Sequence, residues 1–395
     1  MDNSIDWIFD LDAEYRAKTN RQPYFPSTWD IDADALALPR AMVERALQKS
    51  LDHSHEYLFV DELIGCKDDY AALLKRTCGL EVPREQIAIM PNVTAALFLS
   101  LKALGQLGAT RFLVVTPCYF SVLDTLKDMD ASIFFHHLQD SEEFCIDVDR
   151  LQRDLEHQFI DAVIVTDPVF CAGRDISVSL YKELSIICRD HDCWLLCDNA
   201  LGGLSWEAQR SALECTDKLE ALRDNPKFVY IGSATKKLFL NGIKIAVISA
   251  PMQVVSVVEH ICDYSLGGIT SVQVALFREI YSQEHEATIL GLLDTNLRRI
   301  KDNWSALRAI LHDTSYDMYS PQSGFFTIVH HRRKTIAEVD VPMVTRRYLF
   351  ECDCLTIPNS RFSYYSANRF GFRVSLYKDK ESLLVPVRRC VNIEL

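Results

Sequence analysis

The sequence predicts an α/β protein with a large, mainly parallel central sheet and a smaller α+β domain toward its C-terminal end. The first observation is a series of short runs rich in Val, Ile, Leu and Phe, at residues 111–117, 132–137, 161–168, 193–200, 228–233 and 243–250. Such runs suit strands that are buried on both faces of a parallel sheet. The second observation is that helical stretches separate the runs, as at residues 94–107, where Leu97, Leu101 and Leu104 recur on one face. Strands that alternate with helices in this way indicate helices packed on both faces of one sheet.

The pattern changes near residue 283, which indicates a second domain. A long amphipathic stretch begins there and leads to separate strand-like runs at residues 324–331, 355–358 and 370–377, followed by a last helix. A chain of 395 residues is also long for a single core, and about two domains are expected. We therefore expect an N-terminal segment, residues 1–50, that packs on the small domain, a large domain of residues 51–285 and a small domain of residues 286–395.

Composition and charge exclude several classes of partner. The chain is 48% hydrophobic and 25% charged, as in ordinary soluble globular proteins. Its formal net charge of −13 argues against a nucleic-acid or anionic-membrane partner, because no positive field recruits phosphates. The acidic N-terminus does not resemble a signal peptide, and no run approaches the length of a membrane span. We expect a cytoplasmic protein that binds small molecules.

The cysteines and paired histidines do not have the spacing of a metal site. Thirteen cysteines are scattered along the chain, and without a secretory signal most are expected to be reduced, buried and small hydrophobes. Cys352 and Cys354 are close in sequence, but no second pair or nearby histidine supports a metal or redox role. The pairs at 136–137 and 330–331 place their two histidines on opposite faces of strand-like runs. The sequence therefore predicts no metal ion.

A short motif near the middle of the chain carries the strongest chemical signal. It comprises Ser233, Thr235 and Lys236 at the end of an apolar run, and Gly242 and Lys244 follow six and eight residues after the lysine. A lysine at a strand end can be desolvated enough to attack an aldehyde as a neutral amine. Two hydroxyls and a second cation can gather around a phosphate dianion. An ordinary surface pair of lysines is the alternative for this segment taken alone.

The motif resembles the S-x-[ST]-K-x-x-x-x-x-G-x-[RK] pattern of fold-type I pyridoxal 5'-phosphate (PLP) enzymes, the aspartate aminotransferase superfamily with its class I/II aminotransferase-like members. The resemblance implies a three-layer α/β/α large domain with a mainly parallel seven-stranded sheet. It also implies that Lys236 forms an imine with PLP, while Ser233, Thr235 and Lys244 bind the cofactor phosphate. Lys237 does not fit this role, because only Lys236 lies six residues before Gly242.

Further cofactor residues of the family have counterparts in the correct order. Asn92, Val93 and Thr94 lie between a strand-like run and a helix, where backbone N–H groups and the Thr94 hydroxyl can bind phosphate. Plain N-capping by Asn92 or Thr94 is compatible with this role. Tyr119 stands where the family stacks an aromatic ring on the pyridine. Asp198 ends an apolar run, where the resemblance implies a carboxylate that keeps the pyridine nitrogen protonated.

Two positions depart from the family pattern. The N-P-x-N-P-x-G loop is D-P-V-F-C-A-G at residues 167–173, so Phe170 stands where an asparagine normally contacts the phenolic oxygen of PLP. Leu201 stands where a tyrosine normally contacts the same oxygen. Without these donors, the imine should remain protonated to higher pH. Either another group serves the oxygen, or the chemistry is not plain transamination.

The substrate side and the subunit contacts follow the resemblance more closely. Arg373, between Phe372 and Val374, resembles the arginine that binds the substrate α-carboxylate, although a buried arginine could instead satisfy a structural acid. Tyr57 resembles the tyrosine that reaches the cofactor phosphate of the neighbouring subunit. With Thr270, it implies a homodimer with shared active sites.

The sequence thus predicts a PLP-dependent transferase that acts on an L-amino acid through an aldimine and an α-carbanion. We expect an aminotransferase or an aminotransferase-like biosynthetic enzyme, with β- or γ-elimination, replacement, cyclisation or oxidation as alternatives. A non-catalytic regulator with the same fold is a remote alternative. The joint presence of Lys236, Asp198 and Arg373 favours catalysis over that alternative.

Overall fold

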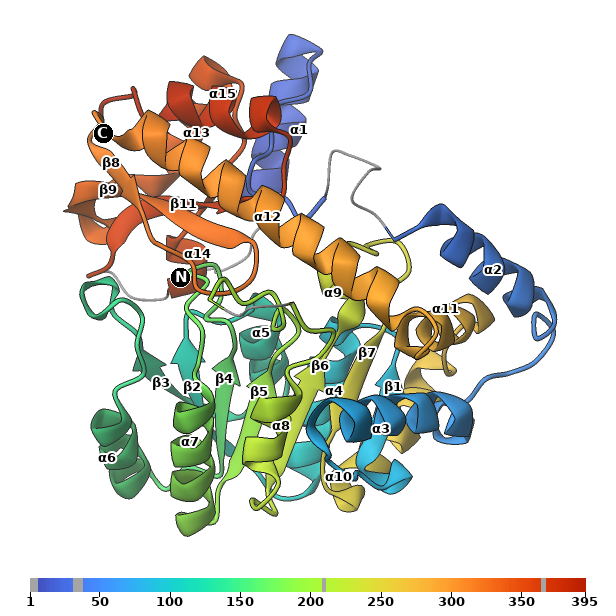
Figure 1. Cartoon of the computed structure of the whole chain (residues 1–395). Helices are drawn as coiled ribbons and strands as arrows, with labels where there is room; N and C mark the ends of the chain where they lie inside the picture. Colours follow the sequence, from blue (N-terminus) through green and yellow to red (C-terminus); the bar gives the residue numbers. More distant parts are fainter. Residues whose placement is uncertain (1–5, 31–37, 208–210, 364–366) are drawn as a thin grey trace.

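A seven-stranded sheet forms the centre of the larger part of the molecule (Figure 1). The computed structural model describes residues 6–30, 38–207, 211–363 and 367–395. The strand order is β1-β7-β6-β5-β4-β2-β3, and only β7 runs antiparallel to its neighbours. The strands are β1 (Ile87–Met90), β2 (Arg111–Thr116), β3 (Ser132–His137), β4 (Ala162–Thr166), β5 (Trp194–Asp198), β6 (Phe228–Gly232) and β7 (Ala246–Ser249). The predicted mainly parallel, seven-stranded sheet is confirmed.

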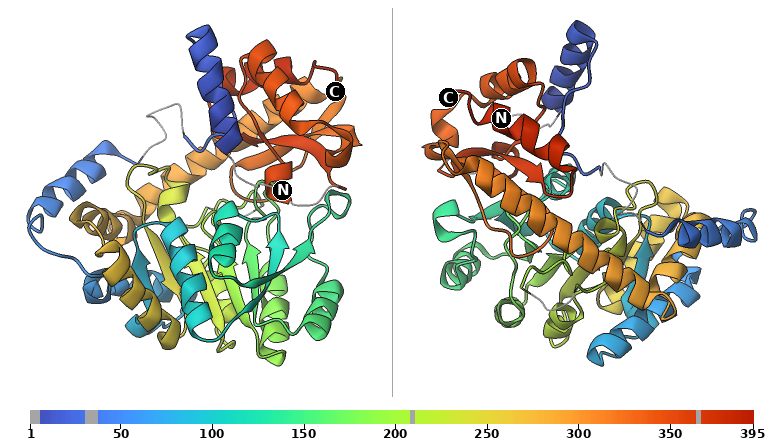
Figure 2. Two further views of the ribbon diagram at one scale, coloured as in Figure 1. Left: turned by 180° about the vertical axis from the view of Figure 1, so that it is seen from behind. Right: turned by 45° about the horizontal axis from the view of Figure 1, so that its top comes forward.

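Helices cover both faces of this sheet, which gives the predicted three layers (Figures 1 and 2). One face carries α3 (Ile64–Cys78), α6 (Val148–Gln158), α7 (Val178–Asp190) and α8 (Thr216–Leu222), and the other carries α4 (Val93–Gln106), α5 (Phe120–Asp128) and α10 (Met252–Leu266). Every residue of β4, β5 and β6 is buried. Burial on both faces explains why these strands are continuous apolar runs in the sequence.

A second, four-stranded sheet lies in the C-terminal part of the chain. Its order is β10-β11-β9-β8, and all neighbours are antiparallel. The strands are β8 (Tyr316–Met318), β9 (Phe326–Thr335), β10 (Ile357–Pro358) and β11 (Arg369–Ser375), and the helices of this part are α13 (Val341–Cys352), α14 (Ser360–Ser363) and α15 (Lys380–Cys390). The long helix α12 (Glu286–Leu311) runs diagonally from this sheet toward the large one (Figure 2). The α+β character expected for this region is confirmed, and β8 is a strand that the sequence pattern did not reveal.

The first part of the N-terminal segment lies against the small sheet's helices. Helix α1 (Asp6–Thr19) packs on α13, and the Tyr15 hydroxyl donates a 2.6 Å hydrogen bond to Asp353 Oδ1. Farther along, the Leu355 N–H donates to the Tyr24 carbonyl at 2.8 Å. These contacts tie residues at the two ends of the chain together.

The second part of the N-terminal segment lies elsewhere. Helix α2 (Arg40–Leu51) packs on α11 (Ser271–Tyr281), within the range expected for the large domain, and Lys49 Nζ lies 2.6 Å from Glu279 Oε1. Residues 1–50 therefore do not act as one unit in the part of the chain that the structure describes. The domain boundaries at residues 50 and 285 stay a prediction.

The cysteines are mostly interior groups. All thirteen have free thiols, and among them Cys352 and Cys354 are buried. No cluster of three or more potential metal ligands occurs within the described ranges. In those same ranges, no helix is both long and apolar enough to cross a membrane.

Candidate active site

A cavity opens at the carboxyl ends of β4, β5 and β6, the place where open α/β sheets bind ligands. It is lined by Trp29, Val93, Thr94, Tyr119, Thr166, Asp167, Phe170, Asp198, Ala200, Leu201 and Lys236. The cavity therefore brings together the predicted cofactor lysine, the predicted pyridine-binding aspartate, the predicted stacking tyrosine and both positions that depart from the family pattern.

Lys236 reaches the cavity from the short helix α9 (Ala234–Lys237), which begins directly after β6 and its N-cap Ser233. Its Nζ atom lies 4.2 Å from the centre of the Trp29 ring. The pKa of Lys236 is lowered to about 8, mainly by burial and also by the nearby Lys244 charge, while Asp198 opposes the shift. A lysine with this pKa is partly a neutral amine near neutral pH, which is the form that attacks an aldehyde.

Lys237, the next residue, points in a different direction. Its side chain is fully buried, and its Nζ atom lies 3.6 Å from Glu214 Oε2. It does not line the cavity. The geometry therefore agrees with Lys236, and not Lys237, as the residue that could bind a cofactor covalently.

Asp198 ends β5 and is 5% exposed. Its Oδ1 atom accepts a 3.2 Å hydrogen bond from the Ala200 N–H. The pKa of Asp198 is raised to about 6, mainly by burial and to a lesser extent by the Asp167 charge, while the Ala200 N–H and Lys236 oppose the rise. The charged form of such a buried carboxylate is stabilised strongly by a nearby cation, and a protonated pyridine nitrogen would supply one.

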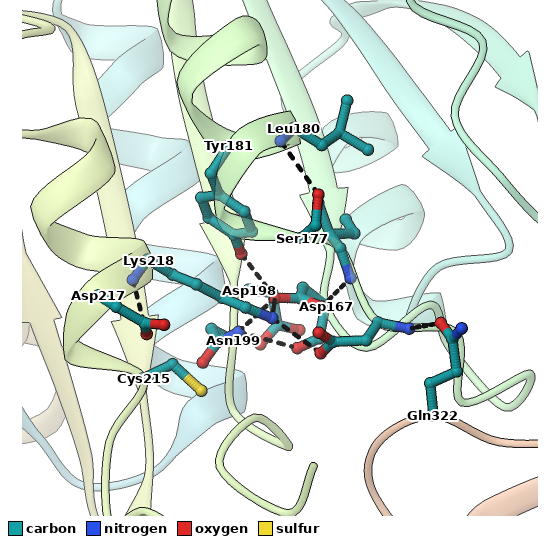
Figure 3. Close-up of polar contacts among 12 residues, drawn as sticks. Asp167, Ser177, Leu180, Tyr181, Asp198, Asn199, Cys215, Asp217, Lys218 and Gln322 are labelled. Carbon is teal, nitrogen blue, oxygen red and sulfur yellow. Dashed lines mark hydrogen bonds and ion pairs between the residues drawn. The ribbon is translucent and has the colours of Figure 1, made fainter. Parts of the chain in front are cut away.

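A buried hydrogen-bond network stands behind Asp198 (Figure 3). At its centre, Asp167 Oδ2 accepts from Lys218 Nζ at 2.6 Å, Asn199 Nδ2 at 2.6 Å and the Tyr181 hydroxyl at 2.9 Å. Asn199 directly follows Asp198, and the Asp167 N–H donates to the Asp198 carbonyl at 2.8 Å. The network therefore fixes the ends of β4 and β5 relative to α7 and α8, and with them the position of Asp198.

The predicted phosphate hydroxyls already have backbone partners. Ser233 Oγ donates to the Ile245 carbonyl at 2.6 Å, and Thr235 Oγ1 donates to the same oxygen at 2.9 Å. Both residues are buried. A phosphate contact would require a hydroxyl hydrogen to turn away from Ile245, so the structure shows a structural role for these hydroxyls and leaves their phosphate role a prediction.

The start of α4 is arranged as expected. Asn92 is the N-cap of the helix, and its Oδ1 atom accepts from the Ala95 N–H at 2.8 Å. Thr94 lines the cavity and also a neighbouring groove, which Asn92, Ser121, Gly268, Thr270 and Gln273 share with other residues. The positive end of the α4 dipole thus faces the region between the cavity and the groove, where an anion would be stabilised.

Gln273 links Lys244 and Thr270 with Pro91, the residue before Asn92. Its Nε2 atom donates to the Pro91 carbonyl at 2.8 Å and to the Lys244 carbonyl. Thr270 caps α11 through a reciprocal pair of contacts with Gln273. Lys244 is exposed. Tyr57 is 81% exposed and stacks on Phe59, and it lines neither the cavity nor the neighbouring groove.

Arg373 lies in β11 and does not line the cavity itself. Its Nε and Nη2 atoms donate to the Ser27 carbonyl at 3.0 and 2.6 Å, and burial lowers its pKa. Its Cζ atom lies 5.4 Å from the centre of the Trp29 ring, the same indole that contacts Lys236. The structure thus places the predicted carboxylate-binding arginine and the cavity lysine against one aromatic side chain.

Four residues that line the cavity, the small Ala200 among them, were not found by sequence analysis. Trp29 comes from the N-terminal segment, which carries no motif. Thr166 is buried at the end of β4, and among the described residues its hydroxyl has no hydrogen-bond partner. Asp167 is a charged residue inside a buried run, and this signal predicts a buried polar partner. The partner, Lys218, is 51 residues away in sequence, so the sequence does not identify it.

Comparisons with known proteins identify the family of the chain. The family model of aminotransferase class I and II matches residues 30–383. The chain belongs to this family. Its structure is similar to a double mutant of aspartate aminotransferase from Thermus thermophilus, with a TM-score of 0.83 and 18% identity over 99% of this chain and 97% of the other. A protein from Escherichia coli with a methionine aminotransferase function gives a TM-score of 0.80 and 17% identity over 98% and 96% of the two chains.

A shorter similarity links the sequence to a different type of enzyme. Over 117 residues, 32% are identical to an 8-amino-7-oxononanoate synthase from Nitrosomonas europaea, and this region is only 29% of each chain. Family membership confirms the predicted fold-type I PLP superfamily and identifies the protein as a PLP-dependent transferase.

The residues in the cavity fit PLP on one side and differ from the family on the other. The lowered pKa of Lys236 and the buried carboxylate of Asp198 suit the aldehyde and the pyridine nitrogen. Phe170 and Leu201 also line the cavity, and neither side chain can donate a hydrogen bond. Phe170 instead packs its ring edge-on against Tyr119 at 5.7 Å between ring centres.

Proposed function

We propose that the protein binds an L-amino acid in this cavity and catalyses either its transamination or a related biosynthetic conversion. One observation carries the proposal: Lys236 and Asp198 line the same buried cavity, and their pKa values are shifted in opposite directions, to about 8 and about 6. Opposed shifts of this kind are characteristic of groups that handle protons at an active site.

Lys236 has two tasks in this proposal. It holds the cofactor covalently until the substrate amine replaces it, and it then moves a proton at the substrate α-carbon. When bound, PLP supplies an electron sink for the negative charge that develops at this carbon. A lysine pKa of about 8 lies close to neutral pH, so the amine can both accept and release the proton.

Asp198 keeps a positive charge on the pyridine nitrogen. Its carboxylate is buried, so an opposite charge at that nitrogen is favoured strongly. The Asp167 network behind it restricts the movement of the strand end that carries Asp198 (Figure 3). Tyr119 bounds the same cavity from the start of α5 and is placed to pack on the ring.

The two anionic groups of the reactants have separate binding regions. Asn92, Val93, Thr94, Ser233, Thr235 and Lys244 are proposed to hold the cofactor phosphate, supported by the position of the α4 N-terminus beside the cavity. Arg373 is proposed to bind the substrate α-carboxylate. Its contact with the Trp29 ring, which Lys236 also contacts, supports this role.

We propose a homodimer in which Tyr57 and Thr270 complete the neighbouring site, in a cytoplasmic protein. The large exposure of the Tyr57 ring and the stacked Phe59 supports a surface that a second subunit covers. Thr270 borders the groove beside the α4 N-terminus, so a second chain on this face would meet the phosphate region.

Phe170 and Leu201 favour a specialised reaction as the second candidate. Elimination, replacement, cyclisation and oxidation share their first steps with transamination. The loss of two hydrogen-bond donors to the phenolic oxygen changes the electron distribution of the cofactor, on which the choice among these reactions depends. These reactions would all use Lys236 and Asp198 in the same way.

The reaction can be tested by incubating the purified holoenzyme with each amino acid, with and without pyruvate or 2-oxoglutarate. Products are followed by mass spectrometry and the cofactor by absorbance, with Lys236→Ala as the control. Amino-group transfer to the oxoacid supports transamination. Products formed without an oxoacid support the second candidate. Absence of any spectral change or product with every amino acid contradicts both.

A further inference from the structure

The short helix α9 presents three consecutive side chains in three directions. Successive residues of a helix are rotated by about 100°. Thr235 Oγ1 donates to the Ile245 carbonyl, Lys236 lines the cavity, and Lys237 Nζ lies 3.6 Å from Glu214 Oε2. The contacts of Thr235 and Lys237 therefore fix the rotation of the helix about its axis. This rotation determines where Lys236 points.

Helix α9 depends on such anchors because it is short. It spans four residues, Ala234–Lys237, and its N-cap Ser233 makes no capping hydrogen bond with its side chain. A single helical turn has little stability of its own, so tertiary contacts must hold it. Of the contacts made by its side chains, the ion pair with Glu214 is the one that involves two buried charges.

The Glu214–Lys237 pair is enclosed on all sides by protein. Lys237 is fully buried and Glu214 is 3% exposed. The Tyr281 hydroxyl donates to Glu214 Oε1 at 2.5 Å, and a methyl group on Gly232 would lie 2.5 Å from Glu214 Oε2. Among the described residues, neither Lys237 Nζ nor Glu214 Oε2 has a hydrogen-bond partner. The ammonium therefore depends on the Glu214 charge to remain in the interior.

We propose that Glu214 is a positioning residue for Lys236: it retains Lys237 in the interior and thereby turns the adjacent lysine into the cavity. The two lysines are equivalent in reach and chemistry, and the ion pair selects which of them faces the cofactor site. The inference rests on the proposed role of Lys236, and it can be tested without cofactor.

The test is amine labelling of the cofactor-free protein. Reductive methylation with formaldehyde at a series of pH values, followed by peptide mapping, measures the reactivity of each lysine. In the wild type, Lys236 should titrate near pH 8 and Lys237 should be protected. In Glu214→Gln, Lys237 should react at least tenfold faster, and the titration of Lys236 should move upward as its amine becomes more exposed to water.

A matched control separates positioning from a general loss of stability. Lys67 and Glu259 form another buried lysine–glutamate pair, 2.7 Å apart, between α3 and α10, and neither lines the cavity. Glu259→Gln should leave the titration of Lys236 and the protection of Lys237 unchanged. An equal change in this control, or unchanged labelling in Glu214→Gln, would overturn the proposal.

A double variant keeps the proposal testable if Glu214→Gln does not fold. Glu214→Gln with Lys237→Met removes both charges at similar volume, a change that buried ion pairs commonly tolerate. If the pair positions Lys236, this folded variant should still show an upward shift of the Lys236 titration. If Lys236 titrates in this double variant as it does in the wild type, the Glu214–Lys237 pair only balances charge. Wild-type protein that passes the labelling test but never binds PLP would contradict the proposed function alone.

Discussion

The two walls of the cavity have opposite character. The ends of β5 and β6 supply a charged wall, with Asp198 and Lys236, whereas Trp29, Phe170 and Leu201 form an aromatic and apolar wall. The charged wall carries the residues predicted to react with the cofactor, and the apolar wall carries Phe170 and Leu201, which the sequence comparison identified as departures. The proposed catalytic residues thus lie at the end of β5 and in the short helix that follows β6, whereas the apolar residues lie in loops and in the N-terminal segment.

The two walls also differ in how strongly their residues depend on each other. Burial shifts the pKa values of Lys236 and Asp198, and the charge of each partly offsets the shift of the other. The apolar wall is held by ring packing, such as the 4.6 Å contact between the centres of Trp29 and Phe326. Changes in the charged wall should therefore affect turnover most, and changes in the apolar wall should mainly tune it.

The largest effect is expected from breaking the charged wall at Asp198. Asp198→Ala removes the buried carboxylate that keeps the pyridine nitrogen protonated, and kcat should fall about a thousandfold, equivalent to about 4 kcal/mol. Steady-state kinetics measure the loss, and circular dichroism checks that the fold is retained. Activity within a few-fold of the wild type would exclude the proposed role of Asp198.

A smaller effect is expected at Arg373, which lies just beyond the apolar wall. Arg373→Lys keeps the charge but loses the planar pair of donors, so kcat/KM should fall by roughly thirtyfold, or about 2 kcal/mol. The cofactor absorbance without substrate should be unchanged. If KM and kcat both stay at wild-type values, another residue binds the substrate carboxylate.

The apolar wall can be converted to the usual family pattern. With Phe170 and Leu201 present, the wild-type lysine–cofactor link should keep its yellow, protonated absorption, without conversion below about pH 8. Phe170→Asn with Leu201→Tyr should lower the pKa of this link by about one unit, which is a tenfold change in its ionisation constant. Absorbance titration measures both proteins.

Thr166 provides the control for that titration. Thr166 lines the cavity and its hydroxyl has no hydrogen-bond partner among the described residues, so it could serve the cofactor in place of the missing donors. If the wild-type link titrates near neutrality, against the expectation above, Thr166→Val should raise its pKa. A link that titrates near neutrality both in the wild type and in Thr166→Val would contradict the importance given to Phe170 and Leu201.

The smallest effect is expected at the subunit contact. Tyr57→Phe removes one hydrogen bond to a phosphate that other groups also hold, so cofactor retention should fall only a few-fold. Mixing Lys236→Ala chains with Tyr57→Phe chains should regenerate intact sites, at most about a quarter of the total in a two-fold symmetric dimer. A fully active monomer in solution would end this part of the account.

Much of the fold was predictable because burial on both faces makes strand runs continuous and apolar. The runs at 228–233 and 193–200 contain β6 and β5 as observed. The three-residue strand β8 was missed because so short a segment, with Asp317 at its centre, has no clear alternation. The long amphipathic helix α12 was foreseen, but its diagonal path across the molecule depends on packing that sequence does not encode locally (Figure 1).

The site was predictable where chemistry imposes local spacing and unpredictable where it depends on distant contacts. Lys236 was identified by its spacing from Gly242 and Lys244 and Asp198 by its place at the end of an apolar run, and the structure places both in one cavity. Trp29 could not be found, because nothing near it in sequence indicates that it packs against Lys236. The backbone partner of Ser233 and Thr235 was also missed, since hydroxyl groups beside a phosphate motif can serve either structure or ligand.

The most direct test of the account is the location of the covalent cofactor. Cofactor-free protein should take up PLP faster as the pH rises through about 8, because the neutral form of Lys236 attacks the aldehyde. Borohydride reduction followed by peptide mapping should then place the pyridoxyl group on Lys236 alone. A pyridoxyl group on Lys237, or on no lysine of α9, would contradict the central claim that the charged wall of this cavity is the active site.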